Sequence, residues 1–130
     1  MNEKIKLSKR ELDVMNVLWE MDKPATAKDI ESFSSELSIN TIIAVLKSLL
    51  KRGFIKVSDI VYSGTVLTRS YEYILTADDY MINQITKGFK KKLSPDKIVA
   101  ALLSEEYDEE TIESLEKLIN QYKDDLNKRN

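Results

Sequence analysis

The chain has 130 residues, of which 42% are hydrophobic and 32% are charged. Its formal net charge is −2, and it contains no cysteine or histidine. This length fits one domain, or a small domain with an extension, and the missing residue types exclude disulfides, thiolate metal clusters and the commonest general base. No apolar run approaches the roughly 18 residues that a membrane span requires, and the amino terminus is too polar for a signal peptide, so we expect a cytoplasmic protein with no membrane partner.

Two capping patterns predict the first two helices. Ser8 and Glu11 have the spacing of a capping box, and apolar residues then recur every three or four positions as far as Trp19, which we expect in the core. Thr26 and Asp29 repeat the capping pattern at the start of a shorter helix. Its predicted apolar face comprises Ala27, Ile30, Phe33 and Leu37. We expect both helices to support the fold rather than to bind a ligand.

A third amphipathic helix is predicted from about Ser38 to Arg52, with Gly53 as its left-handed stop. Its inward side comprises Ile42, Val45, Leu46, Leu49 and Leu50. Its outward side comprises Asn40, Thr41, Ile43, Ala44, Lys47, Ser48 and Lys51. A solvated helix face normally mixes Glu with Lys, whereas this face has no acid and includes two apolar residues. That composition suits the groove and phosphates of DNA, and Lys47 and Lys51 can pair with phosphates.

The remaining outward side chains match the edges of bases. Asn40 can hydrogen-bond an adenine, Thr41 a base or a phosphate, and Ile43 and Ala44 can contact thymine methyl groups. A structural alternative stays open, in which Ile43 and Ala44 pack on a neighbouring segment and Thr41 is a cap residue.

Two strands are predicted after the third helix. Residues 54–62 are rich in β-branched and aromatic side chains, residues 63–64 supply a turn, and residues 66–75 alternate in polarity. One face of the second strand comprises Leu67, Arg69, Tyr71 and Tyr73. Three helices and a hairpin in this order predict a winged helix-turn-helix, a module that usually binds DNA. Arg69 can reach a phosphate or the minor groove, or it can pair with Asp59 or Glu72.

Three more helices are predicted in the carboxy-terminal part. Residues 76–79 cap a helix that ends in the lysine run of residues 90–92, and Ser94 with Pro95 starts a short helix with Ile98, Val99, Leu102 and Leu103 inside. The last helix repeats apolar residues at heptad spacing, namely Ile112, Leu115, Ile119, Tyr122 and Leu126, with Leu118 beside them. Two heptads are too short for an isolated coiled coil, so this seam packs on the short helix, on a second subunit, or on both.

The predicted fold is mostly α with a small β-hairpin wing. We expect a winged-helix DNA-binding domain over residues 1–75 and a helical dimerisation domain over residues 76–130. A dimer is favoured because two recognition helices set about 34 to 36 Å apart can read a palindrome. The predicted dimer contacts are Ile98, Leu102, Ile112, Leu115, Ile119 and Tyr122.

Three segments resemble, in order, the signature segments of the penicillinase-repressor (BlaI/MecI/CopY) family. They are ELDVMNVLWE at residues 11–20, TI with LKSLLKRG within residues 41–53, and RSYEY at residues 69–73. The resemblance implies a homodimeric transcriptional repressor that binds a palindromic operator, with antibiotic resistance as the family's best-known context. It also implies an inactivating protease as a partner, because the penicillinase branch is cleaved in the stretch that corresponds to residues 100–103. The alternative is that the apolar residues of this stretch are simply part of the core.

The chain departs from the family pattern in several places. Ala44 and Ser48 stand where the family usually has Thr and Arg, so the operator sequence does not transfer. The segment between Gly53 and Arg69 is several residues longer than usual, and Thr68 replaces the glycine that commonly precedes the wing arginine. The copper-responsive branch has a cysteine cluster that this chain lacks, which rules out copper or zinc sensing by that route.

Two other classes of function compete with a repressor. A winged-helix module for protein–protein interaction, such as an adaptor or anti-regulator, would use Ile43 and Ala44, although the lack of acids on that face argues against it. An enzyme would need carboxylate pairs such as residues 78–79 or 105–106, but adjacent helical side chains point in different directions. The glycines also stand apart, which excludes a phosphate-binding loop. We therefore expect no catalytic residue, cofactor or metal ligand.

Overall fold

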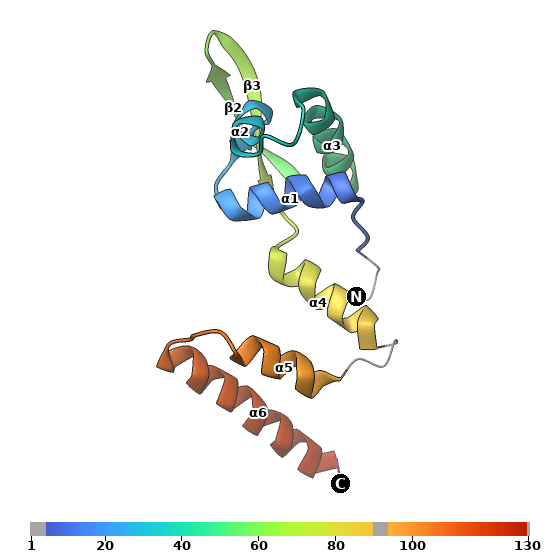
Figure 1. Ribbon diagram of the computed structural model, residues 1–130, viewed down its shortest axis with the longest axis vertical. Coiled ribbons are helices and arrows are strands. Elements are labelled where there is room, and N and C mark those ends of the chain that lie inside the picture. Colours follow the sequence, from blue (N-terminus) through green and yellow to red (C-terminus); the bar gives the residue numbers. More distant parts are fainter. Residues whose placement is uncertain (1–4, 90–93, 130) are drawn as a thin grey trace. The chain divides into compact units, whose positions relative to one another are not determined.

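The computed structural model describes residues 5–89 and 94–129 (Figure 1). The chain divides into two compact units, Met1–Lys91 and Lys92–Asn130. No helix in the described ranges is both long enough and apolar enough to cross a bilayer. The lysine run at residues 90–92, which the sequence places at the end of a helix, lies outside the described residues.

The first unit contains four helices and three strands among its described residues. The elements are α1 (Lys9–Met21), β1 (Ala25–Thr26), α2 (Ala27–Phe33), α3 (Ile39–Arg52), β2 (Ile55–Ser63), β3 (Val66–Tyr73) and α4 (Ala77–Phe89). Both predicted capping boxes are present, at the starts of α1 and α2. The side chain of Ser38 caps α3, and the hydroxyl of Thr76 accepts from the Asp79 N–H at the start of α4. The predicted helix starts are therefore confirmed.

The three strands form one antiparallel sheet in the order β1-β3-β2, and β2 and β3 make the predicted hairpin (Figure 1). A bulge between Val57 and Asp59 shifts the register of β2. Gly64 lies in the connecting turn with φ 65°, a value that favours glycine. The strand β1 is not predicted from the sequence, because two residues show no periodicity.

The hydrophobic core lies where α1, α2 and α3 meet the base of the sheet. Its fully buried large side chains are Val14, Met15, Leu18, Ile30, Ile42, Leu46, Leu49 and Ile55. Trp19 packs against this core in a half-buried position, close to the prediction. The prediction that Phe33 lies on the buried face of the second helix is wrong, since its side chain is 48% exposed. Helix α2 has only seven residues and ends at Phe33, so this side chain extends past the core, while Leu37 from the following turn is buried.

The second unit contains α5 (Pro95–Leu103) and α6 (Glu109–Arg129). Pro95 occupies the first turn of α5, and Asp108 caps α6 by accepting from the Thr111 N–H at 2.9 Å. No described side chain in this unit is buried. Within this unit the apolar face of α5 is only partly covered, so the expectation that it lies inside is wrong for the single chain. Ile98 is half-buried, and the side chains of Val99, Leu102 and Leu103 are 46 to 56% exposed.

Helix α4 belongs to the first compact unit. Our functional division after residue 75 instead groups α4 with the dimerisation region. The division describes roles rather than compactness, and it stays a prediction.

Candidate nucleic-acid interface

Helix α3 is held along one side and free along the other. Its inward side chains are Ile42, Val45, Leu46 and Leu49, which are buried as predicted, and Leu50, which is half-buried against the core. Gly53 ends the helix with φ 80°, and its N–H bonds back to the last turn. The exposed side chains along the free side are Asn40, Ile43, Ala44, Lys47 and Lys51. The structure thus brings five of the predicted DNA contacts onto one solvent-facing strip.

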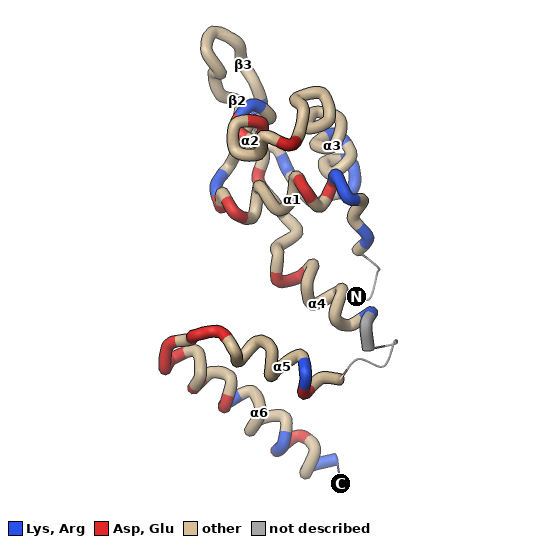
Figure 2. The backbone as a smooth tube through the Cα atoms, viewed as in Figure 1, with Lys and Arg blue, Asp and Glu red and all other residues tan. Residues whose placement is uncertain are grey.

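The exposed strip of α3 carries only positive charge. No acid occurs between Ile39 and Arg52, and in Figure 2 the helix has blue segments but no red one. Within the described part of the chain, neither Lys47 nor Lys51 forms an ion pair. Ile43 is 48% exposed, so the alternative that it packs on a neighbouring segment is wrong for the described chain.

The other two predicted contacts on α3 are engaged within the protein. Thr41 is half-buried, its N–H donates to the Ser38 Oγ at 3.2 Å, and its hydroxyl oxygen accepts from the same Ser38 hydroxyl at 2.9 Å. Ser48 is also exposed, but it donates its hydroxyl proton to Glu11 Oε2 at 2.9 Å. Thr41 therefore takes part in the helix cap, as the structural alternative expects, and Ser48 faces α1.

The wing presents Arg69 next to an apolar surface. Arg69 is exposed on β3 opposite Ile60, and the adjacent cross-strand pair on the same face is Tyr62 with Leu67. The side chains of Ile60, Tyr62 and Leu67 are 59 to 73% exposed. Among the described residues Arg69 forms no ion pair with Asp59 or Glu72. Glu72 instead pairs with Lys56 at 3.1 Å. Arg69 is therefore available to an external anion.

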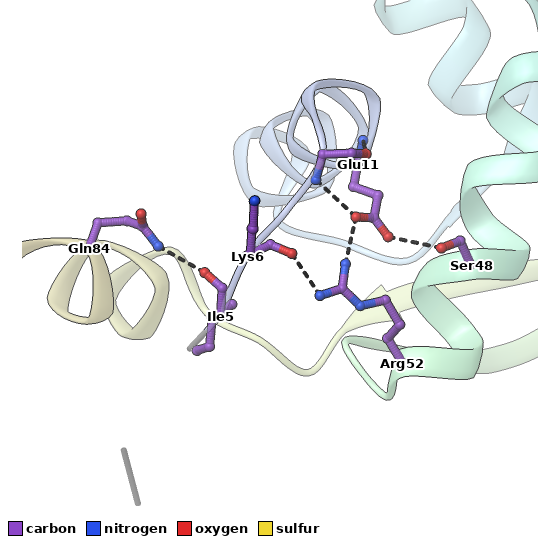
Figure 3. Close-up of polar contacts among 7 residues, drawn as sticks. Ile5, Lys6, Glu11, Ser48, Arg52 and Gln84 are labelled. Atoms are coloured by element: carbon purple, nitrogen blue, oxygen red, sulfur yellow. Dashed lines mark hydrogen bonds and ion pairs between the residues drawn. The ribbon is translucent and has the colours of Figure 1, made fainter. Parts of the chain in front are cut away.

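A buried acid behind α3 is the main feature that sequence reasoning did not predict. Glu11 is 6% exposed, and Arg52 Nη1 lies 2.6 Å from its Oε1 (Figure 3). The same oxygen accepts from the Ser8 N–H at 3.0 Å, which is the predicted capping contact. Burial raises the pKa of this carboxyl, but the hydrogen bonds from Ser8, Arg52 and Ser48 and the charge of Arg52 outweigh it, so the pKa lies below its usual value.

One sequence signal points to this acid. Glu11 precedes Val14 and Met15 by three and four positions, which places it in the buried stripe of α1. An acid in an apolar stripe needs a partner, because an unpaired buried charge is costly. The position of that partner, 41 residues further along the chain, has no local signal.

No described group of acids is arranged to hold a metal ion. A shallow cavity of about 220 Å³ lies beside α1 and the turn before α3, where Phe33 and Leu37 meet the acids Asp13, Glu20 and Glu36. These acids repel phosphate, so the cavity does not extend the basic strip of α3.

Comparisons with known proteins give one family and several distant structures. Residues 7–121 match the family model described as penicillinase repressor. No curated protein matches the sequence significantly. The solved structures with some similarity include the ferric uptake regulator of Francisella tularensis with iron, at 18% identity and TM-score 0.43, where the match spans 53% of each chain. They also include a ZitR variant from Lactococcus lactis, at 14% identity and TM-score 0.45 over 97% of this chain and 80% of that one. A third is the adhesin competence repressor of Streptococcus pyogenes, at 14% identity and TM-score 0.43 over 95% and 83% of the two chains.

Proposed function

Because this chain belongs to the penicillinase repressor family, we propose that it is a homodimeric repressor that binds a palindromic operator through α3 and the wing. Family membership makes it a DNA-binding transcriptional repressor. The observation that carries the finer proposal is the acid-free, exposed strip of α3, which rests on a well-packed scaffold. A DNA-binding role also agrees with the cytoplasmic location expected from the sequence.

The contacts divide into those that position the protein and those that read sequence. Lys47 and Lys51 neutralise phosphates and set the register of α3 along the groove. Asn40 offers an amide that fits an adenine edge, and Ile43 and Ala44 offer apolar contact to thymine methyl groups. Arg69 adds a cation from the wing. Thr41 and Ser48 remain proposed contacts, although each already has an intrachain hydrogen bond.

The apolar seam of the second unit supports the proposed dimer. Along α6, the side chains of Ile112, Leu115, Ile119, Tyr122 and Leu126 are 36 to 61% exposed. Contiguous exposed apolar surface of this kind marks an interface in a soluble protein, because burying it is worth about 25 cal/mol per Å². We propose that a second copy covers this seam together with Ile98 and Leu102 of α5.

A dimer also accounts for specificity. A single recognition helix buries too little surface to select one operator, whereas two helices spaced one helical turn apart read both halves of a palindrome. Packing of the seam on α5 alone is disfavoured by the exposure of both helices.

The protease partner remains part of the proposal. Residues 100–103 lie at the end of α5, and their side chains are exposed. Cleavage there would separate α6 from the DNA-binding unit and thereby break the dimer. Incubation of the purified protein with a cognate protease, followed by mass analysis, tests this step. Fragments cut elsewhere, or no cleavage, would contradict it.

The first test selects native genomic fragments with the purified protein and records the solution mass of the free and bound states. We expect enrichment of a short palindrome that is bound by a dimer. The affinity should fall steeply as the salt concentration rises. Each neutralised phosphate contributes about 0.9 to the magnitude of the slope of log affinity against log salt concentration. No enrichment, with weak binding even at low salt, would overturn the proposal and favour a protein-interaction module.

A further inference from the structure

The amino-terminal segment of residues 5–7 lies between α4 and the end of α3 (Figure 3). At one end, the Ile5 N–H donates to Asn83 Oδ1 at 3.1 Å, and Gln84 Nε2 donates to the Ile5 carbonyl at 2.9 Å. At the next residue, the Lys6 carbonyl accepts from Arg52 Nη2 at 2.6 Å. Ile5 and Leu7 also pack against the core. The segment therefore contacts α4 and α3 within two consecutive residues.

The guanidinium of Arg52 is engaged in contacts within the chain, although the side chain is 36% exposed. One terminal nitrogen bonds to Glu11 and the other to the Lys6 carbonyl, both at 2.6 Å. The planar group also lies over the ring of Phe54, with 4.8 Å from Cζ to the ring centroid. Its charge is thus matched by a carboxylate of the same chain, whereas Lys51, the preceding residue, has no such partner among the described residues.

Glu11 holds α3 at two points one turn apart. Ser48 and Arg52 are separated by four residues, so both lie on the same side of α3 and both bond to the Glu11 carboxylate. Two contacts on one side of a helix restrict rotation of the helix about its axis. The exposed strip with Lys47 and Lys51 is adjacent to this side, so its direction depends on the same contacts.

We propose that Arg52 and Glu11 are positioning residues for DNA binding, and that residues 5–7 form a brace that couples the orientation of α3 to α4. The proposal rests on the proposed function, since the orientation of α3 matters only if α3 reads DNA. Helix α4 leads along the chain to the helices that form the proposed dimer. If the dimer fixes the direction of each α4, the brace also fixes the direction in which each recognition helix faces.

The salt dependence of binding separates a positioning arginine from a phosphate contact. We compare Arg52→Gln with Lys51→Gln as the matched control, using the operator that the wild-type protein selects. Lys51→Gln should lower the salt slope by about 0.9 for each phosphate that the side chain no longer neutralises. Arg52→Gln should lower the affinity by roughly 2- to 30-fold and leave the slope unchanged. A slope that falls as much as in the lysine variant would overturn the proposal.

A conservative variant separates geometry from charge. Arg52→Lys keeps the positive charge, but a single ammonium group cannot reproduce the two-sided contact of the guanidinium. We expect its affinity to remain below that of the wild-type protein, with an unchanged salt slope. Full recovery of affinity would mean that only charge matters at this position, which contradicts a positioning role. Circular dichroism and thermal unfolding of each variant identify any that fail to fold.

The brace itself is tested by the preferred spacing of half-sites. The variants are Gln84→Ala, alone and combined with Asn83→Ala, and the control is Thr86→Ala, whose hydroxyl bonds to the Ile82 carbonyl within α4. The readout is the ratio of affinities for the selected operator and for one with an extra base pair between its halves. The brace variants should lower this ratio by roughly 2- to 30-fold, and the control should not.

A purely structural role for the brace would lower the unfolding temperature and leave this ratio unchanged, which would overturn the proposal. The failure of the proposed function looks different, because the wild-type protein would then select no operator at any salt concentration. In that case both proposals fall. If the wild-type protein binds its palindrome with a steep salt dependence and the brace variants keep its spacing preference, only the brace is refuted.

Discussion

The indole N–H of Trp19 donates to the backbone carbonyl of Leu75 at 2.8 Å. This contact joins α1 to the residue that lies between β3 and α4. The ring of Tyr80, at the start of α4, lies 5.8 Å from that of Trp19, and both Leu75 and Tyr80 are buried. The beginning of α4 is therefore fixed to the winged-helix unit, which explains why that compact unit continues beyond residue 75.

Substitution of Trp19 by Phe should destabilise the first unit. The variant keeps an aromatic ring against Tyr80 but leaves the Leu75 carbonyl without its donor, at a cost of about 1 to 3 kcal/mol. Urea denaturation followed by circular dichroism measures the change. Trp19→Ala, which also removes the ring, should cost more, about 3 to 5 kcal/mol. Equal stability of Trp19→Phe and the wild-type protein would show that the hydrogen bond contributes nothing.

Reversal of charge on α3 should abolish DNA binding without unfolding the protein. The double variant Lys47→Glu with Lys51→Glu places carboxylates where we propose phosphate contacts. The fold should persist, because both lysine side chains are exposed and form no ion pair within the described chain. Lys23→Glu, at an exposed position after α1, has the same chemistry and serves as the control. Titration of labelled operator checks the outcome. Retained binding in the double variant would favour an apolar protein contact through Ile43 and Ala44.

The acid stability of the first unit should depend on Glu11. The folded pKa of Glu11 lies below its unfolded value of about 4.3, so its stabilising contribution is present above that value and is lost as the pH falls through the folded pKa. Glu11→Gln should be less stable near pH 7, by about 1 to 3 kcal/mol, because the bonds to Arg52 and Ser48 are no longer charge-assisted.

Urea denaturation between pH 2 and 7 tests this linkage. The difference in the free energy of unfolding between the wild-type protein and the Gln variant should shrink toward low pH. A difference that stays constant over the whole range would mean that ionisation of Glu11 does not stabilise the fold. Glu36→Gln, at an exposed position in the turn before α3, controls for the general effect of removing one carboxylate.

Local patterns and long-range contacts differ in what the sequence discloses. The capping boxes and the glycine after α3 are recognisable because each depends on residues within one turn of the chain. The exposure of Phe33 is not recognisable in this way, because it depends on how far α2 extends past the core. The strand β1 is not recognisable either, because it depends on pairing with β3. The acid-free, exposed strip of α3 was predictable from the residues on its outward side. The restraint behind it was not, because Arg52 meets Glu11 only after the chain has folded.

Gly53 should resist substitution because of its backbone conformation. Its φ of 80° lies in the left-handed region, and a Cβ added there meets no atom within 4 Å, so any cost comes from strain rather than from a clash. Gly53→Ala should destabilise the first unit by about 1 to 2 kcal/mol. Gly53→Asn should cost less, because Asn tolerates this region better. Thermal unfolding compares the two, and an alanine variant as stable as the wild-type protein would contradict the cap.

Charge introduced into the seam of α6 should separate the subunits and spare the DNA-binding unit. Leu115 and Ile119 lie at consecutive seam positions and are 36% and 54% exposed in the single chain. If a second copy buries them, the double variant Leu115→Glu with Ile119→Glu places four carboxylates in one apolar interface, two from each subunit, and such unpaired charges cannot be buried. Sedimentation should give a monomer that keeps the helical content of the wild-type protein. Operator affinity should fall sharply, because each monomer can then reach only one half-site.

Lys117→Glu, between the two seam positions but on the other side of the helix, should remain a dimer. A dimeric double variant would place the subunit contact elsewhere on the chain and leave the seam to pack on α5.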